Sequence, residues 1–342
     1  MSLISFHRSL RRRDALGRSL ASLMGLFPSK GFAARYWSSA ANAGRTMKVE
    51  VVVAPGGTHD IVARSAASLL EKNISSSIVV ENRPGGASRI AISYVASQPA
   101  DGFTILQHAG SFSYMSEFFP GGGLDPMVDY IPVSGLIESP MALLVNGRSP
   151  YKDMGSLIAD LRKFPEKYNW GVAYIGSSDH LLSIEFLQKA GVNPKKVNFI
   201  GYKGEAPMKI DFKGGRLNIV MQGLVSYEAL ISAGDARPLA IGSKRRLEEW
   251  PAVPTFVEQG MAGYEPSIWW GWFLKAGTPP GVVSDLAEET EKVKSNPDFK
   301  ARMKKMGAEV FPSGRDVFAE RVASDRKTFV SLIKELGIKL SD

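Results

Sequence analysis

The 342-residue chain contains no cysteine. A disulfide framework, a thiolate zinc site and a cysteine nucleophile are therefore excluded. Anchoring through a lipid-modified cysteine at a processed N-terminus is excluded for the same reason. The sequence also lacks any run that approaches the ~18 consecutive apolar residues of a membrane span. We therefore expect a mature chain that does not insert into a membrane.

Motifs that carry common enzyme chemistry are missing as well. The histidines, His7, His59, His108 and His180, match no metal-binding spacing such as HExxH. No Gly-x-Ser-x-Gly nucleophile motif occurs, and no Gly-Lys-Ser/Thr of a Walker loop follows the first glycine pair. We predict no catalytic residue, no metal and no cofactor, and hence no enzyme. Turnover of a bound ligand would revive the rival hypothesis of an α/β hydrolase or transferase.

Basic charge is concentrated at the start of the chain. The formal net charge is +8, but residues 1–43 hold seven basic residues against Asp14, which leaves 35 basic and 33 acidic residues in the remainder. The body of the protein is thus nearly neutral. Its charge gives no reason to expect a nucleic-acid partner.

The first 43 residues have the pattern of a secretory signal. A basic start is followed by a modest apolar stretch that ends at Phe27 and by the small-residue sequence Ala41-Asn42-Ala43. Arg12-Arg13 resembles a twin-arginine address, and the general export route is the alternative. Arg18 interrupts the apolar stretch and the gap from Phe27 to Ala43 is long, so a disordered or mitochondrial-type leader stays open. We predict a signal peptide over 1–43 and a periplasmic location.

Length and pattern indicate two α/β halves, because domains average ~150 residues. β-branched runs bounded by Gly, Pro and Asn predict strands, and apolar residues at helical spacing predict the helices between them. Alternating strands and helices favour parallel sheets with right-handed crossovers. The predicted strands are 48–54, 77–81, 103–106, 141–145, 170–174, 198–200, 217–221 and 239–242, and the predicted helices are 58–72, 90–97, 154–164, 180–190, 282–293, 297–306 and 316–336.

Two turns join a predicted strand to a predicted helix and carry the candidate site. A helix N-terminus offers unpaired N–H donors and a partial positive charge, which suit an anion. An ordinary strand-to-helix turn capped by Thr58 or Asp60 is the alternative for the first of them, and the charge of Asp179 complicates the second. The candidate ligand-binding residues are Gly56, Gly57, Thr58, His59 and Asp60 in the first turn and Ser177, Ser178, Asp179 and His180 in the second.

An aromatic cluster lies at residues 269–273. Trp269, Trp270, Trp272 and Phe273 are expected to pack in a core, and a wall for an apolar or aromatic ligand is the alternative.

An ordered set of motifs over residues 47–340 resembles the substrate-binding proteins of tripartite tricarboxylate transporters, the Bug receptors. Each motif is weak alone, but their order and spacing together are specific. The matching stretches are Pro55-Gly56-Gly57 with Asp60 and Arg64, 79–85, 101–104, 176–181, 202–204, 214–215, 251–255, 263–264, Trp269 with Gly271 and Phe273, 276–279 and 306–309.

The resemblance implies a two-lobed periplasmic-binding-protein (Venus flytrap) fold with the ligand in a cleft between lobes. It also implies that the first turn and residues 177–180 grip a carboxylate through backbone N–H groups and water. The chain departs from the family pattern at His59, Asp179, Asn218 and Lys275. The first two lie in the proposed grip and leave the identity of the ligand open. His59 would strengthen binding below its pKa if it touches the ligand.

The complete prediction is an extracytoplasmic receptor for a di-, tricarboxylate or aromatic acid. Lobe 1 is expected to comprise 47–146 plus 266–342, and lobe 2 to comprise 147–265. The expected partners are the ligand and the membrane subunits of a tripartite transporter, and the receptor is expected to be a monomer. The alternative function is a periplasmic ligand sensor that signals to a membrane kinase.

Overall fold

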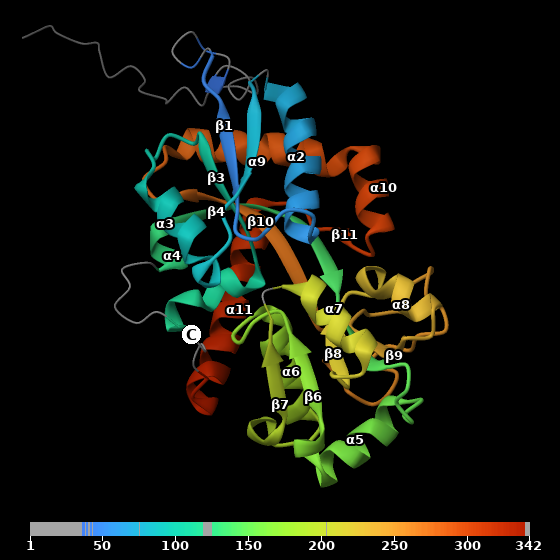
Figure 1. Ribbon diagram of the computed structural model, residues 1–342. Helices are drawn as coiled ribbons and strands as arrows, with labels where there is room; N and C mark the ends of the chain where they lie inside the picture. The colour runs from blue at the N-terminus through green and yellow to red at the C-terminus, as the bar shows by residue number, and fades with distance from the viewer. Residues whose placement is uncertain are drawn as a thin grey trace, which may run out of the picture.

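The computed structural model describes residues 36–37, 39, 42, 44–74, 76–118, 125–202 and 204–338. The predicted signal peptide, 1–43, lies outside the described residues apart from four positions. Two mixed sheets form two lobes, which Figure 1 shows one above the other. The predicted class, an α/β two-lobed periplasmic-binding-protein fold, is confirmed.

The first lobe is built on a six-stranded sheet. Its strands run in the spatial order β11 (Glu309–Val310), β4 (Tyr130–Pro140), β10 (Ser267–Lys275), β3 (Thr104–Ala109), β1 (Met47–Val51) and β2 (Ile78–Asn82). The sheet is parallel across β2, β1 and β3 and antiparallel from β3 to β11. Helices α2 (Thr58–Ile74), α3 (Arg89–Ser97), α4 (Pro126–Asp129), α9 (Pro280–Ser295), α10 (Pro297–Lys305) and α11 (Arg315–Leu336) belong to this half.

The second lobe is built on a five-stranded sheet. Its order is β7 (Asn198–Gly201), β6 (Asn169–Val172), β8 (Ile219–Gln222), β5 (Ala142–Asn146) and β9 (Ala236–Ile241). Its helices are α5 (Met154–Lys163), α6 (Ser178–Lys189), α7 (Glu205–Gly214) and α8 (Glu228–Ser232). Short 3₁₀ turns occupy Gly86–Ser88, Gly110–Phe118, Pro165–Lys167, Pro194–Lys196 and Val225–Tyr227.

One predicted boundary is wrong. Residues 142–146 were assigned to the first lobe, but β5 pairs with β8 and β9 in the second sheet. The chain therefore leaves the first sheet at Pro140 and returns to it at Ser267. The sequence reading missed this because β4, the strand that precedes β5, was not predicted, and a single residue separates the two strands.

The two crossings lie side by side and are tied together by the last helix. Met141 N donates to Pro266 O at 2.8 Å, which joins the outgoing and the returning segment. Arg321 of α11 donates to Glu138 Oε1 of β4 at 2.6 Å and to Ser267 Oγ of β10 at 3.1 Å. A charge-assisted fork of this kind fixes two strands at once. The first-lobe ends of the two crossings are thus joined to each other and to α11.

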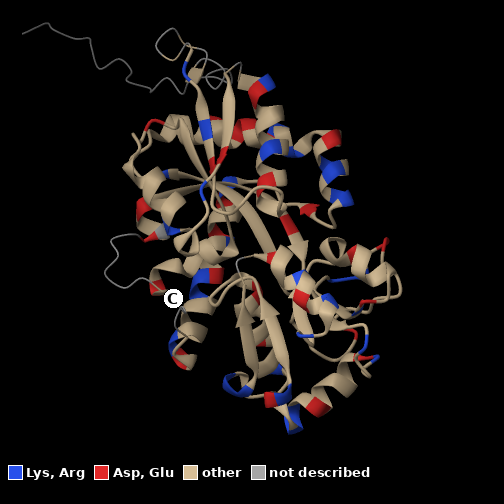
Figure 2. Ribbon diagram, viewed as in Figure 1, with Lys and Arg blue, Asp and Glu red and all other residues tan. Residues whose placement is uncertain are grey.

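Charged residues of both signs are distributed over the two lobes. Figure 2 shows Lys and Arg interspersed with Asp and Glu over both lobes. Among the described helices, none has the length and apolar character that crossing a bilayer requires. Within the same residues, no three side chains of the types that bind metals lie together.

Candidate ligand-binding site

The first turn, residues 55–60, joins β1 to α2. Gly56 adopts φ +90°, which favours glycine. Its amide donates to Asp60 Oδ2 at 3.0 Å, and Asp60 Oδ1 accepts from Arg64 Nε at 2.9 Å. Burial raises the pKa of Asp60, but the hydrogen bonds from Arg64 and Gly56 outweigh it and hold that pKa below its usual value. The Asp60 carboxylate therefore closes the turn and caps α2.

The second turn, residues 175–180, joins β6 to α6 and has the same form. Gly176 also adopts φ +90°, and its amide donates to His180 Nδ1 at 2.9 Å. Asp179 Oδ2 accepts from Ala173 N and from Gln222 Nε2, both at 2.8 Å. His180 thus takes the place in this turn that Asp60 takes in the first, and Asp179 ties the turn to Ala173 and Gln222. Burial lowers the pKa of His180 to about 4, so its imidazole is neutral at pH 7.

Several amides of both turns stay without a partner. In the described chain, the backbone N–H groups of Gly57, Thr58 and His59 donate no hydrogen bond, and neither do those of Ser178 and His180. These groups stand at the N-termini of α2, which has 17 residues, and α6, which has 12. Unpaired first-turn amides together with the helix dipole attract a negatively charged group. Each lobe therefore has one helix N-terminus that favours an anion.

Both turns meet the same bridging segment, residues 107–114, where β3 continues into a 3₁₀ turn. The side chain of Gln107 donates to His59 O. On the other side, Ser111 Oγ lies 3.1 Å from Tyr174 OH and Tyr114 OH lies 3.5 Å from Ser178 Oγ. A Cβ at Gly110 would lie 3.2 Å from Ser178 Oγ. Residues 107–114 therefore contact the N-terminal turn of one helix from each lobe.

Three ring nitrogens near the first turn are also without a partner in the described residues. They belong to His59 (Nδ1), His108 (Nε2) and Trp270 (Nε1), and all three atoms are buried. The His59 ring lies 6.2 Å from that of His108 and 5.9 Å from that of Trp270. His108 Nδ1 accepts from Ala109 N at 2.8 Å and also lies 3.2 Å from Ala109 O, which would accept from it in the other tautomer. Trp270 Nε1 is therefore an unused neutral donor, and His108 Nε2 is an unused ring nitrogen.

The predicted site residues thus divide into two groups. The free amides belong to Gly57, Thr58, His59, Ser178 and His180, whereas Gly56 and the carboxylates of Asp60 and Asp179 hold the turns in shape. Sequence reasoning missed Gln107, Ser111, Tyr114 and Tyr174. The sequence could have pointed to the first three, because polar residues follow the predicted strand 103–106. Polar turns follow the predicted strands 48–54 and 170–174 in the same way.

Trp269, Trp270, Trp272 and Phe273 all belong to buried core clusters, as expected, and the Trp270 ring also lies 5.9 Å from the His59 ring. Trp269 Nε1 donates to Asp325 Oδ2 at 2.7 Å, and Trp272 Nε1 donates to Gln107 Oε1 at 2.9 Å. Gln107 therefore links the core to the His59 carbonyl with both ends of its amide.

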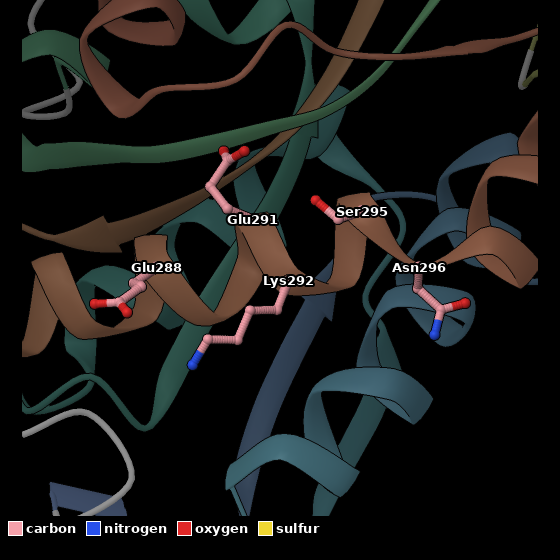
Figure 3. A pocket seen from close by; sticks show the side chains of 5 residues that line it. All are labelled: Glu288, Glu291, Lys292, Ser295 and Asn296. Atoms are coloured by element: carbon pink, nitrogen blue, oxygen red, sulfur yellow. The ribbon is translucent and has the colours of Figure 1, made fainter. Parts of the chain in front are cut away.

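A separate hollow of about 480 Å³ runs along α9. Figure 3 shows its lining, which consists of Glu288, Glu291, Lys292, Ser295 and Asn296. Two of its charges are already paired on the helix itself, Glu291 with Lys294 at 2.7 Å and Lys292 with Glu289 at 2.6 Å. All the lining residues come from α9 and the residue that follows it, so the hollow is a feature of one helix surface.

Comparison with known proteins identifies the family of the chain. The family described as "Tripartite tricarboxylate transporter family receptor" matches residues 62–338. The chain belongs to this family. The receptor is 30% identical to a Pseudomonas sp. (strain P51) protein, "UPF0065 protein in tcbD-tcbE intergenic region", over 82% of this chain and 83% of that protein.

Solved structures show the same fold along nearly their whole length. An R. palustris protein, "Rpa4515 with adipate", matches with a TM-score of 0.78 and 29% identity. The match covers 87% of this chain and 99% of the R. palustris chain. The periplasmic binding protein BugD matches with a TM-score of 0.76 and 28% identity. This match covers 86% of this chain and 99% of the BugD chain. These relatives are solute-binding receptors and not enzymes. The receptor therefore belongs to a class of periplasmic solute-binding proteins, as the sequence predicted.

His59 is expected to leave the pH dependence of ligand binding unchanged. Burial lowers its pKa to about 4, so the ring is neutral from pH 5.5 to pH 8 and gains no proton in that range. His59→Gln should therefore shift the dissociation constant by the same factor at every pH in this range. Titration calorimetry at three pH values checks this, and a change in slope for His59→Gln would restore a titrating role for the imidazole.

Proposed function

We propose that the receptor is exported to the periplasm and captures a small organic carboxylate between its lobes for the membrane subunits of a tripartite transporter. The observation that carries the proposal is the pair of helix N-termini, one per lobe, with unpaired amides next to the same bridging segment. Hinged closure about the two crossings would bring both sets of amides onto one ligand.

The energies are adequate for such a grip. A hydrogen bond to a charged group contributes roughly 1.5–3 kcal/mol, and the helix dipole adds about 0.3–1 kcal/mol at an exposed site. Three such bonds with two helix ends come close to the ~8 kcal/mol of a micromolar complex. No arginine or lysine is needed, and neither turn contains one.

The unused Nε1–H donor of Trp270 supports a ligand with a further oxygen. Leaving a buried donor without an acceptor costs roughly 1–3 kcal/mol, so such groups are normally met by a ligand or by water. A carboxylate or hydroxyl oxygen at the far end of the ligand would accept from this donor. A related structure contains adipate, a carboxylate at both ends of an apolar chain.

Adipate is therefore the first ligand to test on the purified mature receptor. We expect titration calorimetry to give a micromolar dissociation constant for a carboxylate in a panel of dicarboxylates, tricarboxylates and aromatic acids. The dimethyl ester of the best ligand has the same skeleton without charge and should bind at least tenfold more weakly, because helix ends favour anions. Equal binding of acid and ester, or no binding to any acid, would contradict the proposal.

A further inference from the structure

Part of the predicted leader is packed into the first lobe. Trp37 falls within 1–43, yet its side chain is 1% exposed and belongs to the main hydrophobic core. Its ring lies 5.3 Å from that of Phe103, edge to face, and 4.7 Å from that of Tyr36. Glycine at position 102 leaves room for the Trp37 ring, because a Cβ there would lie 2.9 Å from that ring. Gly102 also adopts φ +85°, which favours glycine. The fold thus contains a seat for this tryptophan.

Polar contacts hold the same segment at both sides of the tryptophan. Tyr36 OH donates to Asp101 O at 2.7 Å, and Asn42 Nδ2 donates to Tyr36 O at 2.7 Å. The Arg45 guanidinium lies 3.7 Å above the Phe103 ring and pairs with Asp101. Asn42, the middle residue of Ala41-Asn42-Ala43, is 8% exposed. Asn42, the described residue of the predicted cleavage site, thus packs against the folded lobe.

We infer that the leader is cut before Tyr36, and that the mature receptor keeps Tyr36, Trp37 and Asn42 as part of lobe 1. Cleavage after Ala43 would remove the tryptophan and leave a cavity between Phe103 and Gly102, which the packed core would fill only in part. The inference rests on the proposed export.

Upstream residues offer the chemistry that such a cut requires. Signal peptidases select small side chains at the positions one and three residues before the cut. Gly31-Phe32-Ala33 supplies that pattern, and Ala34 follows it. A cut there also shortens the otherwise long gap after Phe27. Export of a folded precursor by the twin-arginine route adds a second reason, because a buried Asn42 is closed to a protease.

The direct test is the N-terminus of the exported protein. We expect the full precursor, expressed in a Gram-negative host, to yield a periplasmic form whose intact mass and N-terminal sequence place its first residue at or before Tyr36. A mature form that begins at Gly44 would overturn this inference while leaving export intact. An uncut chain that stays in the cytoplasm would overturn the proposed export and this inference with it.

Paired variants separate the two cleavage sites. Ala41→Leu combined with Ala43→Leu puts large side chains at both key positions of the downstream site. Its processing should match that of the wild-type precursor within twofold in a pulse-chase experiment. Accumulation of the uncut precursor of this double variant would show that the cut follows Ala43.

Trp37 itself gives a readout in the mature protein. Trp37→Ala should lower the melting temperature of the exported receptor on the order of 10 °C, since a fully buried aromatic side chain is removed. Trp37→Phe should lower the melting temperature less. This variant provides the measurement if Trp37→Ala does not fold. Phe164→Ala is the control, because that ring is 40% exposed. A melting temperature unchanged by both Trp37 variants would overturn the inference.

Discussion

Thr58→Pro is expected to weaken carboxylate binding about 10- to 150-fold with little loss of stability. Proline removes a single N–H donor, and losing one hydrogen bond to a charged group costs roughly 1.5–3 kcal/mol, with 1.4 kcal/mol per tenfold change in affinity. The substitution suits the backbone because Thr58 is the first residue of α2, where proline is common and no intrahelical bond is lost. Gly57 before it tolerates the restriction that proline imposes.

The matched control keeps the amide and removes the side chain. Thr58→Ala should change the dissociation constant less than threefold, and both variants should melt within a few degrees of the wild-type receptor. Titration calorimetry and thermal melting of the three proteins measure this. If the proline and alanine variants bind equally well, the first-turn amide does not hold the ligand.

The equivalent change in the second lobe is Ser178→Pro. Ser177 already has φ −67° and ψ 165°, the extended conformation that a following proline prefers. Ser178→Pro should cause a similar loss of affinity. Ser178→Ala is the control, because it removes the hydroxyl that lies near Tyr114 but keeps the amide. If one proline variant loses affinity and the other does not, the carboxylate is gripped from a single lobe.

Local sequence signals identified the strands and helices that frame the site. The β-branched run at 48–54, the largely apolar run at 170–174 and the glycine turns after them correctly predicted β1, β6, α2 and α6, because these signals act over a few residues. The longest strand, β4, was not predicted. Its sequence, Tyr130–Pro140, holds two prolines, two serines and a glycine, and it is stabilised by β10 and β11, which lie far along the chain.

The parts of the site that depend on tertiary contacts were less predictable. The turns were found, but their meeting at the bridging segment depends on where β3 ends relative to α6. Gly135 and Gly271 illustrate the same limit, since each is required by an aromatic ring of a distant segment, Phe311 or Phe318. A role of Asp60 within the first turn was among the sequence-based alternatives, whereas the bonds of Asp179 to Ala173 and Gln222 became visible only in three dimensions.

Asp179→Asn is expected to stabilise the receptor at pH 8 by about 1–3 kcal/mol. Asp179 is 4% exposed, and burial, with a further contribution from Glu205, raises its pKa to about 6, although hydrogen bonds from Ser177 and Ala173 oppose the shift. A carboxyl whose pKa is higher in the folded state contributes stability below its unfolded value of 3.8, and this contribution is lost as pH rises through 6. A shift of about two pKa units corresponds to about 3 kcal/mol.

Asparagine keeps an oxygen that accepts from Ala173 and Gln222 but never ionises. The stability of the Asn variant should therefore depend less on pH between 4 and 7 than that of the wild-type receptor. Denaturant unfolding at pH 4.5, 6 and 8 measures both. Equal stabilities of the two proteins at pH 8 would show that the charged carboxylate of Asp179 does not destabilise the fold.

Ligand binding should then be coupled to this carboxyl group. An anion held by the amides of Ser178 and His180 lies within the same helix turn as Asp179, so it disfavours the charged form and raises the pKa further. Near pH 6.5 the wild-type receptor should take up a fraction of a proton with each ligand, whereas Asp179→Asn should take up none. Calorimetry in two buffers of different ionisation enthalpy measures this uptake. Because the neutral His59 and His180 gain no proton at that pH, a coupling that survives in the Asn variant would place the titrating group on the ligand itself.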